Sequence, residues 1–227
     1  LHLSIRRQRQ MCVRDRLKKD YPLTWDYLSG YAATLKKRSI VGGSEKDRKW
    51  YQFGRAQSLN KFDSEKIIAT VLSREPKYGY ERDNVVITGG GNGPYYAIRP
   101  RPGSDYSIFF ILAVLCHPLS EAIIRTKTSV FGGGYYSHGK QFLKDLPVPN
   151  INFASKKCVK KHNAVVDKVK KLIALTDSTN TAMAPGKCAV ASKQIEMTRD
   201  AIEASLNQIY RLTPADLDVV RSVPIPE

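Results

Sequence analysis

The chain has 227 residues, of which 42% are hydrophobic and 9% aromatic, so a fold of this size can bury roughly 70% of its unfolded surface. This composition excludes a disordered chain, and no window approaches the roughly 18 consecutive apolar residues of a membrane-spanning helix. Lys and Arg number 37 against 21 Asp and Glu, a net charge of +16. Because clustered cations bind phosphate chains by releasing counterions, the balance predicts a polyanionic partner, without choosing among DNA, RNA, heparin and a membrane surface.

The cysteines and the start of the chain indicate where such a protein works. The four cysteines are widely spaced with no C-x-x-C pair, which predicts neither a disulfide framework nor a zinc site. The first residue is Leu1 rather than Met, and residues 1–20 are too charged for a secretory signal. We therefore expect a fragment of a longer cytoplasmic protein with reduced thiols and no membrane partner.

Charge and periodicity divide the chain into three parts. Residues 1–20 form a basic lead-in, residues 21–150 a mixed α/β region, and residues 151–227 a helical region. The first 150 residues hold 25 basic and 13 acidic side chains, so the polyanion surface is expected mainly there, with an architectural role for the remainder. Together the parts predict an α+β protein.

The mixed region begins with an amphipathic helix over residues 22–38, because Pro22 suits a first helical turn and Trp25, Leu28, Tyr31 and Leu35 recur at spacings of three and four. Turn residues then separate short β-branched stretches. The elements expected beyond the helix are strands over 66–72, 84–88 and 95–98, a glycine turn over 89–94, a buried helix over 106–120, and a glycine-rich loop over 131–140.

The helical region has a seven-residue repeat. Val159, Val166 and Ile173 are spaced by seven, and a second series, Ile195, Ile202 and Ile209, follows a coil over 177–186. This pattern predicts two long antiparallel helices, with the internal partner favoured over a homodimer through the same face. Thr213 and Pro214 form a helix-start signature, which predicts a short terminal helix.

Catalytic motifs are sparse. The chain has no Pro-Pro, which the loop of an amino-methyltransferase needs, and the glycine turn over 89–94 lacks the Gly-Lys-Ser/Thr of a phosphate-binding loop. Cys116 and His117 end an apolar run without a third member, so core packing is favoured over a catalytic dyad. Asp63 with Glu75 and Lys77 matches the letters of a magnesium-dependent nuclease, a short pattern that also fits a surface turn.

Two segments interleave aromatic rings, glycine, amides and cations. Residues 49–57 read KWYQFGRAQ, and residues 132–140 read GGGYYSHGK. Arg and Gln pair with base edges in the major groove, while Tyr, Ser and Lys bind phosphates. Trp50, Tyr51 and Phe53 fit a core equally well, so the polar side chains are the stronger candidates for binding. The predicted DNA-binding residues are Arg55, Gln57, Gly133, Tyr135, Tyr136, Ser137 and Lys140.

The order of several motifs resembles a known family. YPLTWDYLSGYAATLKKR, KWYQFGRAQ, EKIIATVLS, FFILAVLCHPL and FGGGYYSHGKQFLKDLPVP follow one another over residues 20–150. They are similar to the TaqI-like C-terminal specificity domain of adenine-specific DNA methyltransferases and type IIG restriction-modification enzymes. The tail, from HNAVVDKVKKL to SLNQIYRLTPADLDVV, resembles the helices that follow target-recognition domains in type IIG enzymes and type I specificity subunits.

The resemblance implies a target-recognition module of a restriction-modification enzyme used in phage defence. Such a module docks in the major groove of double-stranded DNA while a methyltransferase domain, expected upstream of Leu1, flips the target adenine. The parent would use S-adenosylmethionine and, if it cleaves DNA, magnesium. No catalytic residue, metal site or cofactor is predicted for this chain. The alternatives are a nuclease through Asp63, Glu75 and Lys77, or a basic module that binds RNA or an acidic protein.

Overall fold

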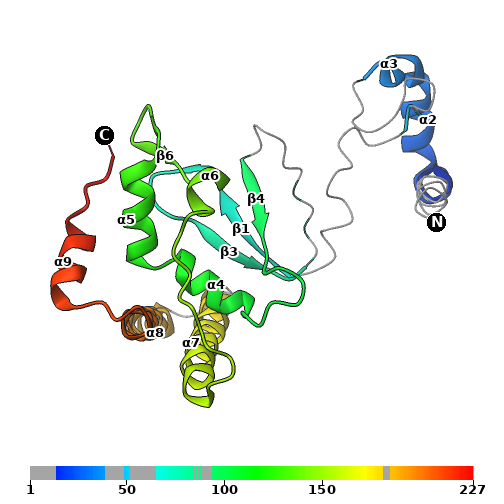
Figure 1. The fold of residues 1–227 in the computed structure, drawn as a ribbon. Helices are drawn as coiled ribbons and strands as arrows, with labels where there is room; N and C mark the ends of the chain where they lie inside the picture. The colour runs from blue at the N-terminus through cyan, green and yellow to red at the C-terminus, as the bar shows by residue number, and fades with distance from the viewer. Residues whose placement is uncertain are drawn as a thin grey trace. The chain divides into compact units, whose positions relative to one another are not determined.

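The structure is a computed structural model that describes residues 14–38, 49–51, 65–83, 85, 87, 94–180 and 185–226. The chain forms two compact units, Leu1–Lys61 and Phe62–Glu227 (Figure 1). The boundary expected near residue 150 falls inside the second unit, where the helical region packs on the mixed region. The architecture is α+β, as predicted, with small antiparallel sheets and long helices.

Over residues 22–38 the structure has two short helices in place of the single helix expected there. They are α2 (Pro22–Gly30) and α3 (Ala32–Lys36), separated at Tyr31, directly after a glycine, which favours a helix end. Pro22 occupies the first turn of α2, where its missing N–H costs nothing. The ring centroid of Trp25 lies 4.8 Å from that of Trp50, and Trp25 also contacts Tyr51. Aromatic contacts therefore join α2 to residues 50–51.

A three-stranded antiparallel sheet begins the second unit. Its strands are β1 (Lys66–Thr70), β3 (Tyr78–Glu81) and β4 (Tyr95–Ile98), in the order β3-β1-β4. β1 and β4 were predicted, whereas β3, with its Tyr-Gly-Tyr-Glu sequence, was not. The strand and turn expected over 84–88 and 89–94 fall almost entirely outside the described residues.

The second sheet corrects the expected glycine-rich loop over 131–140. It contains β2 (Leu72–Ser73), β5 (Val130–Phe131) and β6 (Tyr135–Ser137), in the order β2-β6-β5. Gly133 and Gly134 have φ values of +79° and +74°, which only glycine adopts without strain, so they close a tight hairpin between β5 and β6. The glycines thus form a turn between strands, and helix α6 (Lys140–Leu143) follows.

The helix predicted over 106–120 is two helices, α4 (Ile108–Leu115) and α5 (Pro118–Lys127). Ser107 caps α4 by accepting a hydrogen bond from the Phe109 N–H. The break follows from Pro118, which disfavours helical geometry in the preceding residue and starts a new helix. Within the described ranges, no single helix is long and apolar enough to cross a membrane, and α4 with α5 would qualify only as a pair bent by 57°.

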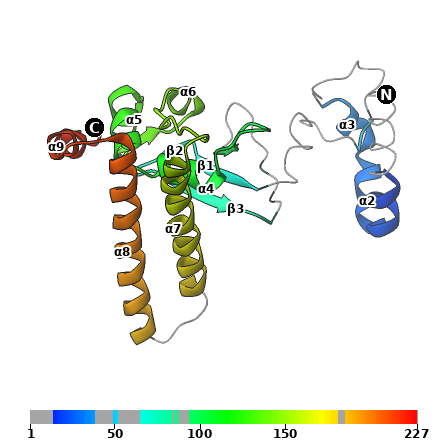
Figure 2. The same ribbon diagram turned by 60° about the horizontal axis from the view of Figure 1, so that its bottom comes forward.

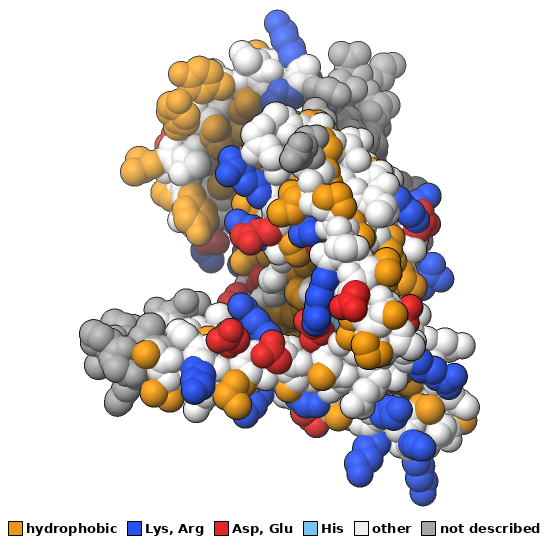
Figure 3. Space-filling view, turned by 90° about the vertical axis from the view of Figure 1, so that its left-hand side faces the viewer, with side chains coloured by type: hydrophobic (Ala, Val, Ile, Leu, Met, Phe, Trp, Pro, Cys, Tyr) orange, Lys and Arg blue, Asp and Glu red, His pale blue; other side chains and the backbone are white. Residues whose placement is uncertain are grey.

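The helical hairpin agrees with the seven-residue repeat. α7 (Lys156–Asn180) and α8 (Pro185–Tyr210) lie side by side (Figure 2), with Val165, Val169 and Leu206 buried. Their apolar stripes therefore meet within one chain. Acidic and basic side chains mix along the helical arm seen in Figure 3. The expected terminal helix is α9 (Pro214–Ser222), whose start has a reciprocal capping box between Thr213 and Asp216.

The core of the second unit centres on α4, which contacts β1 and β3 as well as α7 and α8. Polar contacts also connect the mixed region to the hairpin. The Tyr106 hydroxyl donates to the Pro149 carbonyl at 2.9 Å and accepts from the Ile151 N–H at 3.0 Å. On α8, the Tyr210 hydroxyl donates to the Pro147 carbonyl at 2.7 Å. The chain between the two regions is therefore held against both.

Candidate nucleic-acid interface

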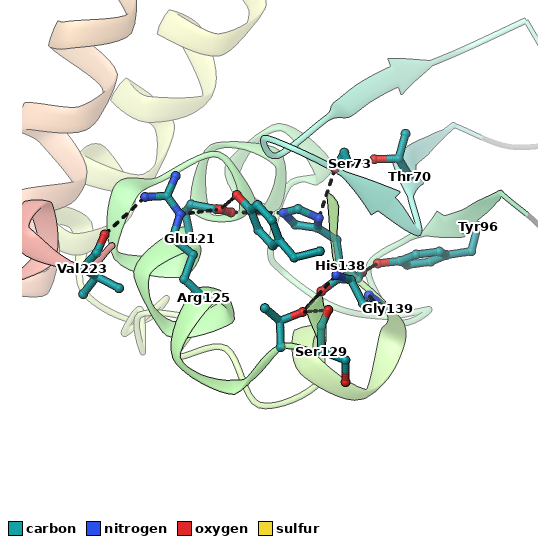
Figure 4. A network of polar contacts seen from close by, with 12 residues as sticks. Thr70, Ser73, Tyr96, Glu121, Arg125, Ser129, His138, Gly139 and Val223 are labelled. Atoms are coloured by element: carbon teal, nitrogen blue, oxygen red, sulfur yellow. Dashed lines mark hydrogen bonds and ion pairs between the residues drawn. The ribbon is translucent and has the colours of Figure 1, made fainter. Parts of the chain in front are cut away.

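A buried polar network lies beneath the β2-β6-β5 sheet (Figure 4). At its centre is Glu121 of α5, whose carboxylate accepts hydrogen bonds from the Tyr136 hydroxyl, from Arg125 Nε at 3.0 Å and from His138 Nε2 at 3.3 Å. Burial would raise the pKa of Glu121, but the hydrogen bonds from His138, Tyr136 and Arg125 outweigh burial and hold the pKa below its ordinary value. Glu121 is thus an ionised group that connects α5 to β6.

His138 extends the network to β2. Its Nδ1 lies 3.1 Å from Ser73 Oγ, and the Thr70 hydroxyl donates to that same oxygen at 3.3 Å. With a proton on Nε2, that nitrogen donates to Glu121 and Nδ1 accepts from Ser73, so each polar group has a partner. The peptide carbonyl of His138 accepts a further hydrogen bond from the Tyr96 hydroxyl of β4. One histidine therefore joins both sheets to α5.

The sequence Ser73, His138, Glu121 has the chemical order of a nucleophile, a base and an acid. All three side chains are buried, with 4%, 1% and 6% of each residue exposed. A nucleophile must reach its substrate, and Ser73 points into the protein toward Thr70 and His138 (Figure 4). We assign the three residues a structural role, which is to fix β6 in place.

The opposite face of the same sheet is exposed. In the register of the sheet, Phe131 pairs with Tyr135, and Leu72 pairs with Ser137. Because side chains alternate along a strand, Leu72, Phe131, Tyr135 and Ser137 share one face, which we call outward, while Ser73 and Tyr136 share the inward one. Leu72, Phe131 and Tyr135 are 45%, 48% and 43% exposed. We call these three residues and Arg74 the outer face.

Arg74 completes the outer face with a cation. Its guanidinium carbon lies 5.1 Å from the centroid of the Tyr135 ring, a cation–π contact in which both groups stay exposed to solvent. Gly133 lies beside this pair, and a Cβ at that position would be 3.8 Å from the guanidinium. The hairpin turn therefore brings its backbone close to the arginine. A planar cation stacked on an aromatic ring suits contact with nucleobases and phosphates.

The structure separates the predicted DNA-binding residues into three groups. Gly133 and Tyr135 are exposed at the outer face, and Lys140 is exposed at the start of α6. Tyr136 and Ser137 are buried. Tyr136 points inward and donates to Glu121, whereas Ser137 lies on the side of Leu72 and Tyr135, where its hydroxyl accepts from the Gly139 N–H and its backbone bonds to Thr128. Arg55 and Gln57 lie outside the described residues.

Three residues of the site carry no clear signal in the sequence. Arg74 stands in a Ser-Arg-Glu-Pro turn that resembles any solvated loop, and Glu121 is one acid in an ordinary helical pattern. His138 lies within the predicted segment, but a single histidine reveals neither its burial nor its partners.

The residues that the sequence suggested for the catalytic alternatives make the following contacts. Glu75 and Lys77 form an exposed ion pair of 3.6 Å in the turn between β2 and β3, and Asp63 is outside the described residues. Across the described ranges, no group of three His, Cys, Asp or Glu side chains is placed to hold a metal ion. His117 is buried at the start of α5, where Nδ1 accepts from the Leu119 N–H at 3.2 Å and Nε2 lies 3.0 Å from Asn207 Oδ1. His117 therefore connects α5 to α8.

Comparison with known proteins relates the chain to restriction-modification enzymes. One relative is the type II restriction enzyme and methyltransferase RM.Eco57I of Escherichia coli, which is 26% identical over 213 residues. The match covers 92% of this chain but only 21% of the length of that enzyme. No protein-family model matches the chain. The similarity supports a role in a restriction-modification system.

Proposed function

We propose that this chain is the duplex-DNA recognition part of a type II restriction-modification enzyme, of the TaqI-like specificity class found in type IIG enzymes. It positions a methyltransferase domain of the parent protein over a target adenine in phage or host DNA. Similarity to RM.Eco57I along 92% of the chain and the net charge of +16 support this proposal.

The observation that carries the proposal is the exposed outer face above a fixed polar network. Leu72, Phe131 and Tyr135 present apolar and aromatic surface, and Arg74 adds a planar cation. Arg reads guanine with two hydrogen bonds in the major groove, and apolar side chains contact the thymine methyl group. The β5–β6 hairpin, which a major groove admits, would present these groups to base edges. Lys140 and Arg55 would add contacts to phosphates or bases.

The parent enzyme would contain the chemistry that this chain lacks. A methyltransferase domain with S-adenosylmethionine would transfer the methyl group, and a nuclease domain with magnesium would cleave the DNA. Base flipping would take place in that methyltransferase domain, because this chain has no Pro-Pro loop to hold an extruded amino group. The proposed location is the cytoplasm, where the enzyme meets incoming DNA.

Selection from a random duplex library at near-physiological salt tests the proposal directly. We expect recovery of a defined sequence motif, because base readout survives at a salt concentration that weakens phosphate attraction. Recovery of random duplexes, with a steep salt dependence, would contradict sequence recognition by this chain. Preferential binding of structured RNA in competition would instead favour the alternative of an RNA-binding module.

Variants of the outer face sharpen the test. Arg74→Ala and Tyr135→Ala should each weaken binding to the selected motif by about tenfold or more, since a good base contact contributes about 1–3 kcal/mol. Arg74→Lys keeps the charge and should lose discrimination among motif variants while retaining affinity for random DNA. Met197→Ala, an exposed apolar change on α8, is the control. Unchanged motif affinity in both alanine variants would remove the outer face from the proposed site.

A further inference from the structure

Positive charge in the helical hairpin is concentrated on one helix. α7 has seven Lys and two Asp, whereas α8 has three basic and three acidic residues. The sequence predicts an architectural role for residues 151–227, because their net charge of +4 is small beside the +12 of residues 1–150. The net charge of this region does not show how its charges are distributed. The excess positive charge lies on α7, and four of the seven lysines of α7 lie at its start.

Four lysines fall within the first six residues of α7: Lys156, Lys157, Lys160 and Lys161. We call them the lysine face. With about 3.6 residues per turn, Lys156 and Lys160 lie opposite the buried Val169, and Lys157 and Lys161 continue the face round the helix to the edge of the buried stripe. All four are exposed, and within the part of the chain that the structure describes none forms an ion pair. In Figure 3, Lys and Arg side chains project below the helical arm at the end away from its grey tip.

This arrangement weakens the isolated helix in two ways. Lys156 and Lys160, like Lys157 and Lys161, are like charges four residues apart, which repel each other on a helix surface. They also lie at the amino-terminal end of α7, where the helix dipole disfavours cations, and the first turn has no acidic residue. Binding of a polyanion would relieve both effects. A helix with only a structural role would gain nothing from lysines placed in this way.

A groove beside the lysine face favours one kind of polyanion. It has a volume of about 550 Å³ and apolar residues in its lining, with Lys156, Lys160 and Asn163 among its polar groups. Its lining residues are Phe153, Ala154, Lys156, Val159, Lys160, Asn163, Ala164 and Asp167. A sugar–phosphate backbone presents both apolar sugar and anionic phosphate, which matches this lining. Asp167 repels an anion at the far end, which limits phosphate contacts to the lysine half.

We propose that the lysine face binds the phosphate backbone of duplex DNA and adds sequence-independent affinity to the chain. The inference rests on the proposed function and assigns a second contact surface to it, outside the sheet that would read bases. Over the roughly 8 Å from Lys156 to Lys161, one strand passes about two phosphates, given about 3.4 Å of axial rise per nucleotide. The hairpin would thus grip DNA beside the recognition sequence.

The test measures how affinity depends on salt in the full chain. K156Q/K160Q should make the negative slope of log affinity against log salt shallower by up to about 1.8, since each lost phosphate contact removes about 0.9. The quadruple Lys→Gln variant should make it shallower by at least as much and weaken binding to selected and random duplexes by equal factors. K193Q/R199Q removes the same charge as the double variant from exposed positions on α8 and should leave the slope unchanged.

Helix content and the melting temperature of each variant provide the folding control. Both lysine variants should melt at or above the temperature of the unmodified chain, because repulsion at the start of α7 is removed. An unchanged salt slope in the quadruple variant would overturn the proposal. So would a loss of binding to anionic phospholipid vesicles with no loss of binding to DNA.

The outcome is separable from that of the proposed function. If the chain selects no motif but the lysine variants still make the salt slope shallower, sequence recognition fails and the lysine face stands. If the chain selects a motif and the slope does not change, recognition stands and the lysine face fails. A chain that binds no duplex at all overturns both.

Discussion

The interior beneath the β2-β6-β5 sheet is polar, whereas the interior between α7 and α8 is mainly apolar, with a hydrogen bond from Lys168 to Ser205 across it. In the first, Glu121, Tyr136 and His138 hold a short sheet through directional hydrogen bonds. In the second, Val165, Val169 and Leu206 pack without polar partners. Strands of two or three residues bury too little apolar surface to fix their own position, so hydrogen bonds set it. Helices of about 25 residues bury enough.

The two interiors also differ in the surface that each one holds in position. The polar interior lies directly under the outer face, where a displaced Tyr135 or Arg74 would lose its geometry. The apolar interior lies under a helix surface whose proposed contacts are with phosphates, which tolerate variation in position. We therefore expect damage to the two interiors to differ in size and in consequence.

The largest effect is expected from Glu121→Ala. Removing the carboxylate leaves Arg125, Tyr136 and His138 without their shared acceptor, and loss of one partner of a buried ionic group costs about 3–5 kcal/mol. Denaturant titration followed by tyrosine fluorescence measures the loss. Glu75→Ala, which removes an exposed ion pair with Lys77, is the control and should change stability by less than about 0.5 kcal/mol. Equal small losses in both variants would contradict the role given to the network.

The corresponding change in the apolar interior is Leu206→Ala, with an expected loss of about 3 kcal/mol. Leu206 has no exposed surface, so truncation removes buried methyl groups and leaves a cavity between α7 and α8. Chemical denaturation measures the loss in the free energy of unfolding. Met197→Ala, at an exposed position of the same helix, is the control. If DNA selection is retained in Leu206→Ala but lost in Glu121→Ala at a temperature where both are folded, the distinction between the interiors is supported.

The pH dependence of stability tests the charge in the polar interior, because Glu121 is the ionised group there. The pKa of Glu121 is lower in the folded chain than its ordinary value of 4.5, so its contribution is complete above that value and is lost as pH falls through the folded pKa. Stability should therefore decrease below about pH 4.5 more steeply in the unmodified chain than in Glu121→Gln, which cannot ionise. Urea midpoints between pH 3 and 6 test this. Parallel curves would show that Glu121 is not the ionised centre of the network.

Sequence periodicity predicted the apolar interior but not the polar one. The repeat of Val159, Val166 and Ile173 with Ile195, Ile202 and Ile209 indicated two paired helices, and Thr213 with Pro214 marked the start of α9. A long helix repeats its pattern many times, so single exceptions do not obscure it. β2, β5 and β6 have two or three residues each, which is too short for any period to be visible.

The candidate site was predicted in part for the same reason. The segment 132–140 was singled out by its aromatic, glycine and cationic residues, but its division into an exposed Tyr135 and a buried Tyr136 depends on partners distant in sequence. Glu121 is 15 residues from Tyr136, and Arg74 is 61 residues from Tyr135. No local pattern specifies contacts at that separation, so the supporting residues emerged only from the fold.

The smallest effect is expected at Tyr135, next to a residue where the same change has a measurable cost. Tyr136→Phe deletes a buried hydroxyl that donates to Glu121, and should lower stability by about 1–2 kcal/mol. Tyr135→Phe deletes a hydroxyl on an exposed ring and should stay within about 0.5 kcal/mol while retaining the cation–π contact with Arg74. Paired denaturation curves measure both variants. Because the same hydroxyl is deleted at two adjacent positions of β6, equal losses would mean that the strand does not present Tyr136 to the core and Tyr135 to solvent.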